Sequence, residues 1–366
     1  MNASQLKKLM KFHRGFGMVL GILVLMWSLT GVLHPIMSAT QPQPAKRMPP
    51  FQQLHLEHAM PASQVLQQHN ITQFSALQAI QLQPKLVAYR VLKPNQNSAE
   101  YYDSQTSQFI EHGEQHDAKC LALWYTGLAK EQIVSAKLIT EFSDDYPSVN
   151  RLLPVWRVSF DNGLRAYVDP SQSRLATLSN DQKMWMARIF RLGHTWTWGD
   201  QAWFGQTILM QIALIGILVL VVMGVALFFK IHNRKNHRLR QKPSRFLHRY
   251  LAISLSVFIT LWLISGFYHV WQKKPAVQNI QPIFNTHDLS LEAWQTATQQ
   301  PLQRLNLVPI ALNNAQAVAG WMVQFVGTPQ MQGSMTAVKE HDHHNRAKSA
   351  APTIELIDAK TSAKLD

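Results

Sequence analysis

Two segments of the chain repeat one membrane-helix pattern, with a histidine at each end. The first reads HRGFGMVLGILVLMWSLTGVLH from His13 to His34, and the second reads HRYLAISLSVFITLWLISGFYH from His248 to His269. They agree without a gap at six aligned positions, which are His13/His248, Arg14/Arg249, Leu20/Leu255, Trp27/Trp262, Gly31/Gly266 and His34/His269. The two histidines of a segment are 21 residues apart. Because that length of helix rises about 31 Å, close to the ~30 Å bilayer core, one histidine is expected near each membrane face.

The repeat also places the two histidines of a helix near one helix face, within roughly 60° at about 100° per residue. Two such helices side by side would offer a pair of imidazoles at each side of the membrane. Paired imidazoles are suitable axial ligands for b-type haem, so we expect two haems held by His13, His34, His248 and His269. A single histidine at a helix end is more often an interfacial residue, but four in matched register favour ligation of haem iron.

Three apolar runs, at 16–37, 207–229 and 251–270, are each long enough to span a membrane. The net charge is +14, and much of it precedes the first run or lies between the second and third, which should place both segments in the cytoplasm. The basic loop lacks the stacking aromatics of a nucleic-acid site, so we expect no nucleic-acid partner. The predicted organisation is a cytoplasmic N-terminus (1–14), three spans (15–37, 206–229 and 250–271), a basic cytoplasmic loop (230–249) and outer α+β domains at 38–205 and 272–366.

One strand–turn–strand phrase occurs three times in the segments outside the spans. An alternating strand, a variable turn and a second strand end at Asp103, Asp169 or Asp358, each followed by small or polar residues. These phrases predict β-hairpins in which the aspartate starts a turn. Together with the repeated spans they indicate two copies of one module, which consists of a span, an outer domain and a second span. The second copy lacks a fourth span and half a domain, and a fragment, a frameshifted product and a shortened family member all remain open.

The histidine-flanked spans, their Thr30-Gly31 and Ser265-Gly266 dipeptides and the strand–turn–Asp phrase resemble the PepSY-associated transmembrane family of bacterial inner-membrane proteins. The resemblance covers nearly the whole chain. It implies a multi-pass inner-membrane protein with PepSY-like α+β domains in the periplasm, and four spans rather than three are usual in such proteins. Members of the family include haem-containing reductases that release iron from ferric siderophores, so the resemblance implies a ferric siderophore as the electron acceptor and a possible reductase activity.

Further residues near the spans are candidates for the same site. His194 precedes the second span and is an alternative haem ligand on the outer side, in place of His34 or His269. Gly31 and Gly266 could make room for a flat macrocycle or for a close helix. Trp196, Trp198 and Trp203 form a predicted aromatic belt, whose usual role is anchoring at the membrane interface. Arg14 and Arg249 could pair with haem propionates or serve as ordinary positive-inside anchors.

Other metal sites have weaker support. Cys120 is the one cysteine, so neither an intramolecular disulfide nor a thiolate-held iron–sulfur cluster is possible. His112, His116 and Cys120 are spaced to share a helix face but offer only three ligands, and His341, His343 and His344 form a short cluster suited to adventitious binding.

The predicted function is transfer of electrons from the cytoplasmic side to a periplasmic acceptor. No nucleotide-binding or hydrolase motif is present, so the electrons would come from a membrane quinol or a cytoplasmic reductase. The rival interpretation is a non-enzymatic membrane anchor, whose PepSY-like part binds or regulates a protease, transporter or receptor.

Overall fold

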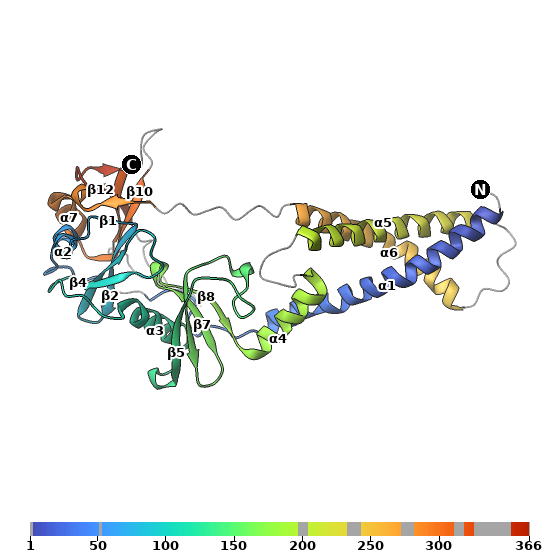
Figure 1. The fold of residues 1–366 in the computed structure, drawn as a ribbon, viewed down its shortest axis with the longest axis horizontal. Helices are drawn as coiled ribbons and strands as arrows, with labels where there is room; N and C mark the ends of the chain where they lie inside the picture. The colour runs from blue at the N-terminus through green and yellow to red at the C-terminus, as the bar shows by residue number, and fades with distance from the viewer. Residues whose placement is uncertain are drawn as a thin grey trace, which may run out of the picture. The chain divides into compact units, whose positions relative to one another are not determined.

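Three long apolar helices and a group of antiparallel sheets make up the computed structural model (Figure 1). It describes residues 3–50, 53–196, 204–232, 243–271, 282–310, 318–325 and 353–365. The chain divides into two compact units. We call residues 1–41, 142–149 and 180–278 the membrane unit, and residues 42–141, 150–179 and 279–366 the sheet unit.

The membrane unit contains α1 (Ala3–Thr40), α5 (Phe204–His232) and α6 (Pro243–Trp271). All three are long and apolar enough to cross a membrane, which confirms the three predicted spans within the described residues. Figure 1 shows them side by side, and their shared core contains Leu20, Trp27, Leu214, Ile217 and Leu263. Many other apolar side chains on these helices are exposed, as expected for surfaces that face lipid.

Two shorter elements complete the membrane unit. Helix α4 (Asp181–Phe190) continues directly into the π-helical turn η4 (Arg191–Thr195). Asn180 caps α4, because its side-chain oxygen accepts a 2.9 Å hydrogen bond from the Lys183 backbone N–H. Segment 142–149 also belongs to this unit, and Asp144 forms a 2.7 Å ion pair with Arg191.

The sheet unit contains a seven-stranded and a four-stranded antiparallel sheet. The seven-stranded sheet has the order β13-β12-β11-β10-β2-β3-β4, with bounds Lys364–Leu365, Ile354–Asp358, Val318–Phe325, Leu302–Ile310, Ala76–Gln83, Leu86–Leu92 and Glu100–Asp103. The four-stranded sheet has the order β5-β6-β7-β8, with bounds Ile133–Ile139, Val155–Phe160, Arg165–Asp169 and Arg174–Ser179. A small two-stranded sheet pairs β1 (Gln73–Phe74) with β9 (Phe284–Asn285).

Three helices pack on these sheets. Their bounds are Ala62–Gln68 for α2, Gly113–Thr126 for α3 and Leu291–Thr298 for α7. Helix α3 covers the four-stranded sheet through a core that includes Leu121, Tyr125 and Val158. Short 3-10 turns lie at Lys130–Gln132, Ser148–Asn150, Pro170–Gln172 and Thr286–Asp288.

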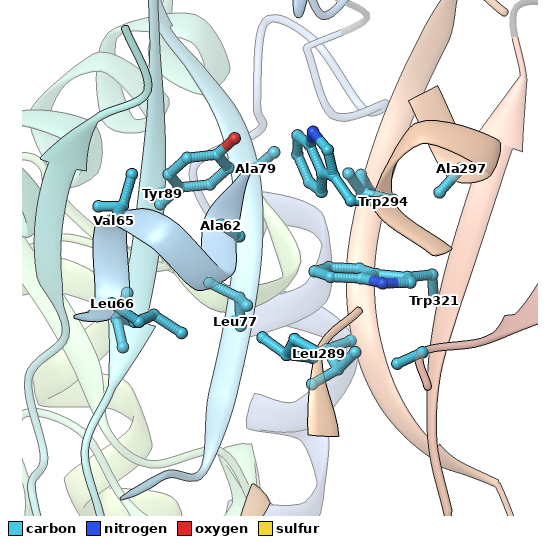
Figure 2. Packing of buried hydrophobic residues seen from close by; sticks show 14 of the residues in the cluster. Ala62, Val65, Leu66, Leu77, Ala79, Tyr89, Leu289, Trp294, Ala297 and Trp321 are labelled. Carbon is cyan, nitrogen blue, oxygen red and sulfur yellow. The ribbon is translucent and has the colours of Figure 1, made fainter. Parts of the chain in front are cut away.

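Strands from the segments 38–205 and 272–366, treated as separate domains in the sequence analysis, form one sheet. They meet where β2 pairs with β10, at Ala79 opposite Leu305 and Gln78 opposite Asn306. One hydrophobic core spans the junction. Its rings are Tyr89 of β3, Trp294 of α7 and Trp321 of β11, at centroid distances of 5.6 Å from Trp294 to each of the others (Figure 2). Each segment thereby covers a sheet edge that the other would leave unpaired.

All three predicted aspartate turns are confirmed. The pairs β3–β4, β6–β7 and β11–β12 are antiparallel, and each second strand ends at the expected aspartate. The Oδ1 atom of Asp103 accepts hydrogen bonds from the backbone N–H groups of Gln105 and Thr106. Asp169 accepts from the Ser171 N–H, and Asp358 accepts from the N–H groups of Lys360 and Thr361. A carboxylate that bonds the backbone two or three residues ahead fixes each turn locally.

Candidate functional site

Residues aligned in the sequence repeat meet in space across α1 and α6. The imidazole rings of His13 and His248 have centroids 6.5 Å apart, and the indole rings of Trp27 and Trp262 have centroids 5.5 Å apart. Both contacts follow the same alignment of the two helices. Two of the six aligned pairs of the repeat are therefore in ring contact, whereas Gly31 packs against His194 and Gly266 against Leu214 of α5.

The His13–His248 pair has the spacing of two imidazoles that share one metal ion. A metal–imidazole bond is about 2 Å long, so two rings in line on one ion have centres about 6 Å apart. The Nδ1 atom of His13 is buried and has no hydrogen-bond partner among the described residues. Space beside this ring depends on Gly224 of α5, where an added Cβ would lie 3.2 Å from His13 Cε1. The pair thus consists of two imidazoles 6.5 Å apart at an interplanar angle of 53°, one of them with a nitrogen that has no partner among the described residues.

Two hydrogen bonds join Trp27 and His194. Trp27 Nε1 donates to the His194 carbonyl at 2.9 Å, and His194 Nδ1 lies 3.2 Å from the Trp27 carbonyl. Since a carbonyl only accepts, Nδ1 must carry the proton, which leaves Nε2 as the acceptor or ligand atom of a neutral ring. Trp196 stacks on Trp27 at a centroid distance of 5.2 Å and an interplanar angle of 17°. A backbone carbonyl on one ring nitrogen is the usual second partner of a metal-binding histidine.

A cavity of about 370 Å³ lies beside this histidine within the membrane unit. Its lining consists of Val24, Trp27, Ser28 and Gly31 of α1, Phe258, Ile259 and Trp262 of α6, and His194. Gly31 is required by the approach of the imidazole, because an added Cβ would lie 3.2 Å from His194 Cε1. The arrangement places the His194 imidazole beside an open pocket with a largely aromatic and aliphatic lining, which also contains Ser28.

Comparison with protein-family models finds one match, the PepSY-associated TM region, over residues 10–356. The chain belongs to the PepSY-associated TM family. Comparison with curated proteins and with solved structures gives no match. Membership agrees with the three candidate spans and the sheet-rich unit, and it identifies a multi-pass membrane protein.

The predicted outer pair of this PepSY-associated TM protein, His34 and His269, stays a prediction, because only the His34 side chain is among the described residues. His34 is exposed, and its nearest ring neighbour is Phe190 at a centroid distance of 5.8 Å. The same phenylalanine stacks on His194 at 4.7 Å, so it lies next to both histidines. The backbone of His269 belongs to α6, but its side chain lies outside the described residues. Trp198, Trp203 and the cluster His341, His343 and His344 also lie outside them.

The alternative ligand set on α3 does not form one helix face. The helix begins at Gly113, and His112 precedes it with a left-handed backbone (φ 55°), so it does not continue the i, i+4 row. His116 and Cys120 do meet, with Nε2 and Sγ 3.6 Å apart. Burial, assisted by Lys130 and Lys119, lowers the pKa of His116. Within the described residues, no three His, Cys, Asp or Glu side chains are grouped to hold a metal ion.

Sequence reasoning missed a buried polar cluster in the sheet unit. Glu114 of α3 forms a 2.8 Å ion pair with Arg90 of β3, and both side chains are about 5 % exposed. Its second oxygen accepts hydrogen bonds from Ser98 Oγ at 2.7 Å and Trp156 Nε1 at 3.2 Å. The one available signal was an acidic residue in the first turn of a helix, which is common at exposed helix starts.

Proposed function

We propose that this protein binds haem between α1 and α6 and passes electrons across the membrane to an acceptor such as a ferric siderophore. The observation that carries the proposal is the His13–His248 pair, at 6.5 Å and in the register of the sequence repeat. Bound haem would supply one-electron transfer through its iron. An unpartnered buried nitrogen costs about 1–3 kcal/mol, which a ligand at His13 would recover.

The second proposed haem site is the cavity beside His194. His194 has a defined tautomer, and the ring is positioned by Trp27 and by stacking on Phe190. The mostly apolar lining would give a ligand surroundings of low polarity. Gly31 is 18 residues from His13 on the same helix, or about 27 Å along its axis, so the two sites are separate. His34 and His269 remain the ligands expected from the repeat alone.

The direction of transfer follows from charge. Lys7, Lys8, Lys11 and Arg14 cluster at the N-terminal part of α1, where His13 also lies. The positive-inside rule places this end in the cytoplasm and the cavity near the outer face of a bacterial inner membrane. Electrons from a quinol or a cytoplasmic reductase would enter at the His13–His248 site and leave on the outer side.

A visible spectrum of the detergent-purified protein tests the proposal. We expect a Soret band, sharp reduced α and β bands after dithionite, and near two haems per chain. The His13→Ala variant should lose about half of the haem, and His194→Ala should lose the remainder selectively. His287→Ala is the matched control, because this imidazole is 75 % exposed in the sheet unit. A colourless protein from cells supplied with haem would contradict the proposal and favour the non-enzymatic anchor.

A further inference from the structure

The α4–η4 element, residues 181–195, packs along α1, and its η4 turn lies beside the apolar part of that helix. An added Cβ at Gly193 would lie 2.6 Å from Thr30 Cγ2, so the η4 backbone touches α1 at Thr30. Deeper still, Trp196 stacks on Trp27. The apolar run of α1 continues to Met37, which is seven residues and about 10 Å beyond Thr30 along the helix. The π-helical turn is therefore level with the apolar part of the span.

Three of the five backbone carbonyls of this turn accept hydrogen bonds within the protein. Arg191 O accepts from the Trp196 backbone N–H and from Thr195 Oγ1. Gly193 O accepts from Trp196 Nε1 at 3.2 Å, and His194 O accepts from Trp27 Nε1 at 2.9 Å. The last carbonyls of a helix have no partner within the helix, and in water they are simply hydrated. Two indole N–H groups that donate to backbone carbonyls are consistent with a site without water, where the protein itself must supply hydrogen-bond partners for non-helical backbone.

The exposed face of the element has the composition of a membrane interface. Trp185 is 64 % exposed and Leu192 is 46 % exposed, with the exposed Arg188 between them. Their spacing of three and four residues places them on one side of the helix. Met186 lies on the inner side and is 7 % exposed. An indole, an aliphatic side chain and an arginine on one face suit the boundary between acyl chains and headgroups, where arginine reaches the phosphates.

We infer that α4–η4 is an interfacial element whose exposed face binds bilayer lipid. Trp185 and Leu192 enter the acyl-chain boundary, and Arg188 pairs with lipid phosphate. The occupant is lipid because α4 and η4 pack along α1, which carries exposed apolar side chains, and because η4 is level with the apolar part of that span. The element holds His194 against Gly31, so lipid contact supports one wall of the cavity. The inference does not depend on what the cavity binds.

Site-directed labelling in nanodiscs tests the inference on the full chain. Cys120 is exposed and is the one cysteine, so Cys120→Ser gives a cysteine-free background. A nitroxide is then attached at Trp185→Cys in discs of phosphatidylethanolamine and phosphatidylglycerol. The matched control is Val134→Cys, because Val134 is apolar and 69 % exposed but lies on β5 of the sheet unit. We expect oxygen to relax the label at 185 more strongly than a water-soluble nickel chelate does, and the reverse at 134.

A label at 185 that responds to the two relaxants as the label at 134 does would overturn the inference. Leu192→Cys provides a second probe on the same face, and it decides the matter if Trp185→Cys does not fold. Lipid accessibility at 192 supports the element, and water accessibility there refutes it. Neither readout requires haem, so failure here is distinguishable from failure of the proposed function.

Discussion

Glu114 in the sheet unit and His13 in the membrane unit are both polar side chains in buried surroundings, but their partners differ. Glu114 has a donor on each carboxylate oxygen, from Arg90 on one and from Ser98 and Trp156 on the other. His13 Nδ1 has no partner among the described residues. A buried polar group whose hydrogen bonds are all formed stabilises a fold, whereas one that lacks a hydrogen-bond partner is available to bind a ligand. The comparison applies to the Glu114 carboxylate and the His13 ring, because Arg90 Nε in the Glu114 cluster is itself buried without a partner among the described residues.

The largest expected effect is that of removing the Glu114 carboxylate. Glu114→Ala removes the ion-pair partner of the buried Arg90 guanidinium, so the free energy of unfolding should fall by about 3–5 kcal/mol. Denaturant unfolding of the full chain in detergent, followed by pulse proteolysis, measures this change. Glu111→Ala is the matched control, because that side chain is 82 % exposed, and it should change stability by less than about 0.5 kcal/mol.

The comparison would be contradicted if His13→Ala lowered the free energy of unfolding by a similar amount in the same experiment. His13 makes no hydrogen bond through Nδ1, so its removal should leave unfolding of the sheet unit unchanged. A small effect of Glu114→Ala would also contradict the structural assignment of its cluster.

The features predicted from sequence are those that depend on nearby residues. Spans follow from apolar runs, and the turns at Asp103, Asp169 and Asp358 follow from bonds to residues two or three positions ahead. Pairing of His13 with His248 was expected because the repeat itself encodes the register. The predictions of spans and turns needed no knowledge of how distant segments meet, whereas the proximity of His13 and His248 was inferred from the repeat.

The features that were missed depend on contacts between distant residues. The β2–β10 junction joins Ala79 to Leu305, and no local pattern specifies which sheet edge a strand will meet. Trp27 and His194 are 167 residues apart, so their reciprocal hydrogen bonds could not be inferred from either helix alone. Sequence proximity to a span identified His194 as a candidate, but the long-range partner Trp27 defines its tautomer.

Asp117 sharpens the comparison, because it lies one turn from Glu114 on α3 but lacks a cationic partner of its own. Burial raises the pKa of Asp117 to about 7, although the hydrogen bond from Tyr101 and the charge of Arg90 lower it in part. The folded state therefore binds this proton more tightly than the unfolded chain, whose aspartate has a pKa of about 4. Its contribution to stability is complete below about pH 4 and is lost as pH rises to about 7.

Asp117→Asn should remove this pH dependence. The asparagine variant should be more stable than the parent at pH 8 by about 1–2 kcal/mol, with the difference shrinking toward pH 4. Denaturant unfolding at pH 5 and pH 8 measures it, with the exposed Asp161→Asn as control. Equal pH dependence of the parent and Asp117→Asn would show that this carboxyl is hydrated in the folded protein.

The smallest expected effect tests whether a completed hydrogen bond in the membrane unit also has a structural role. Trp27→Phe keeps an aromatic ring against Trp196 but removes the N–H that bonds His194 O. Loss of one such bond should cost about 1 kcal/mol, and it should loosen η4 because a carbonyl at membrane depth is left unpaired. A nitroxide at Leu192→Cys should therefore give a sharper, more mobile spectrum in nanodiscs. Trp262→Phe is the control, since Trp262 contacts Trp27 through its ring edge at 5.5 Å. Equal sharpening of the spectrum by both substitutions would show that ring packing, not the hydrogen bond to His194, orders the turn. The hydrogen-bonded Trp27 N–H and the unpartnered His13 Nδ1 would then not differ in structural role.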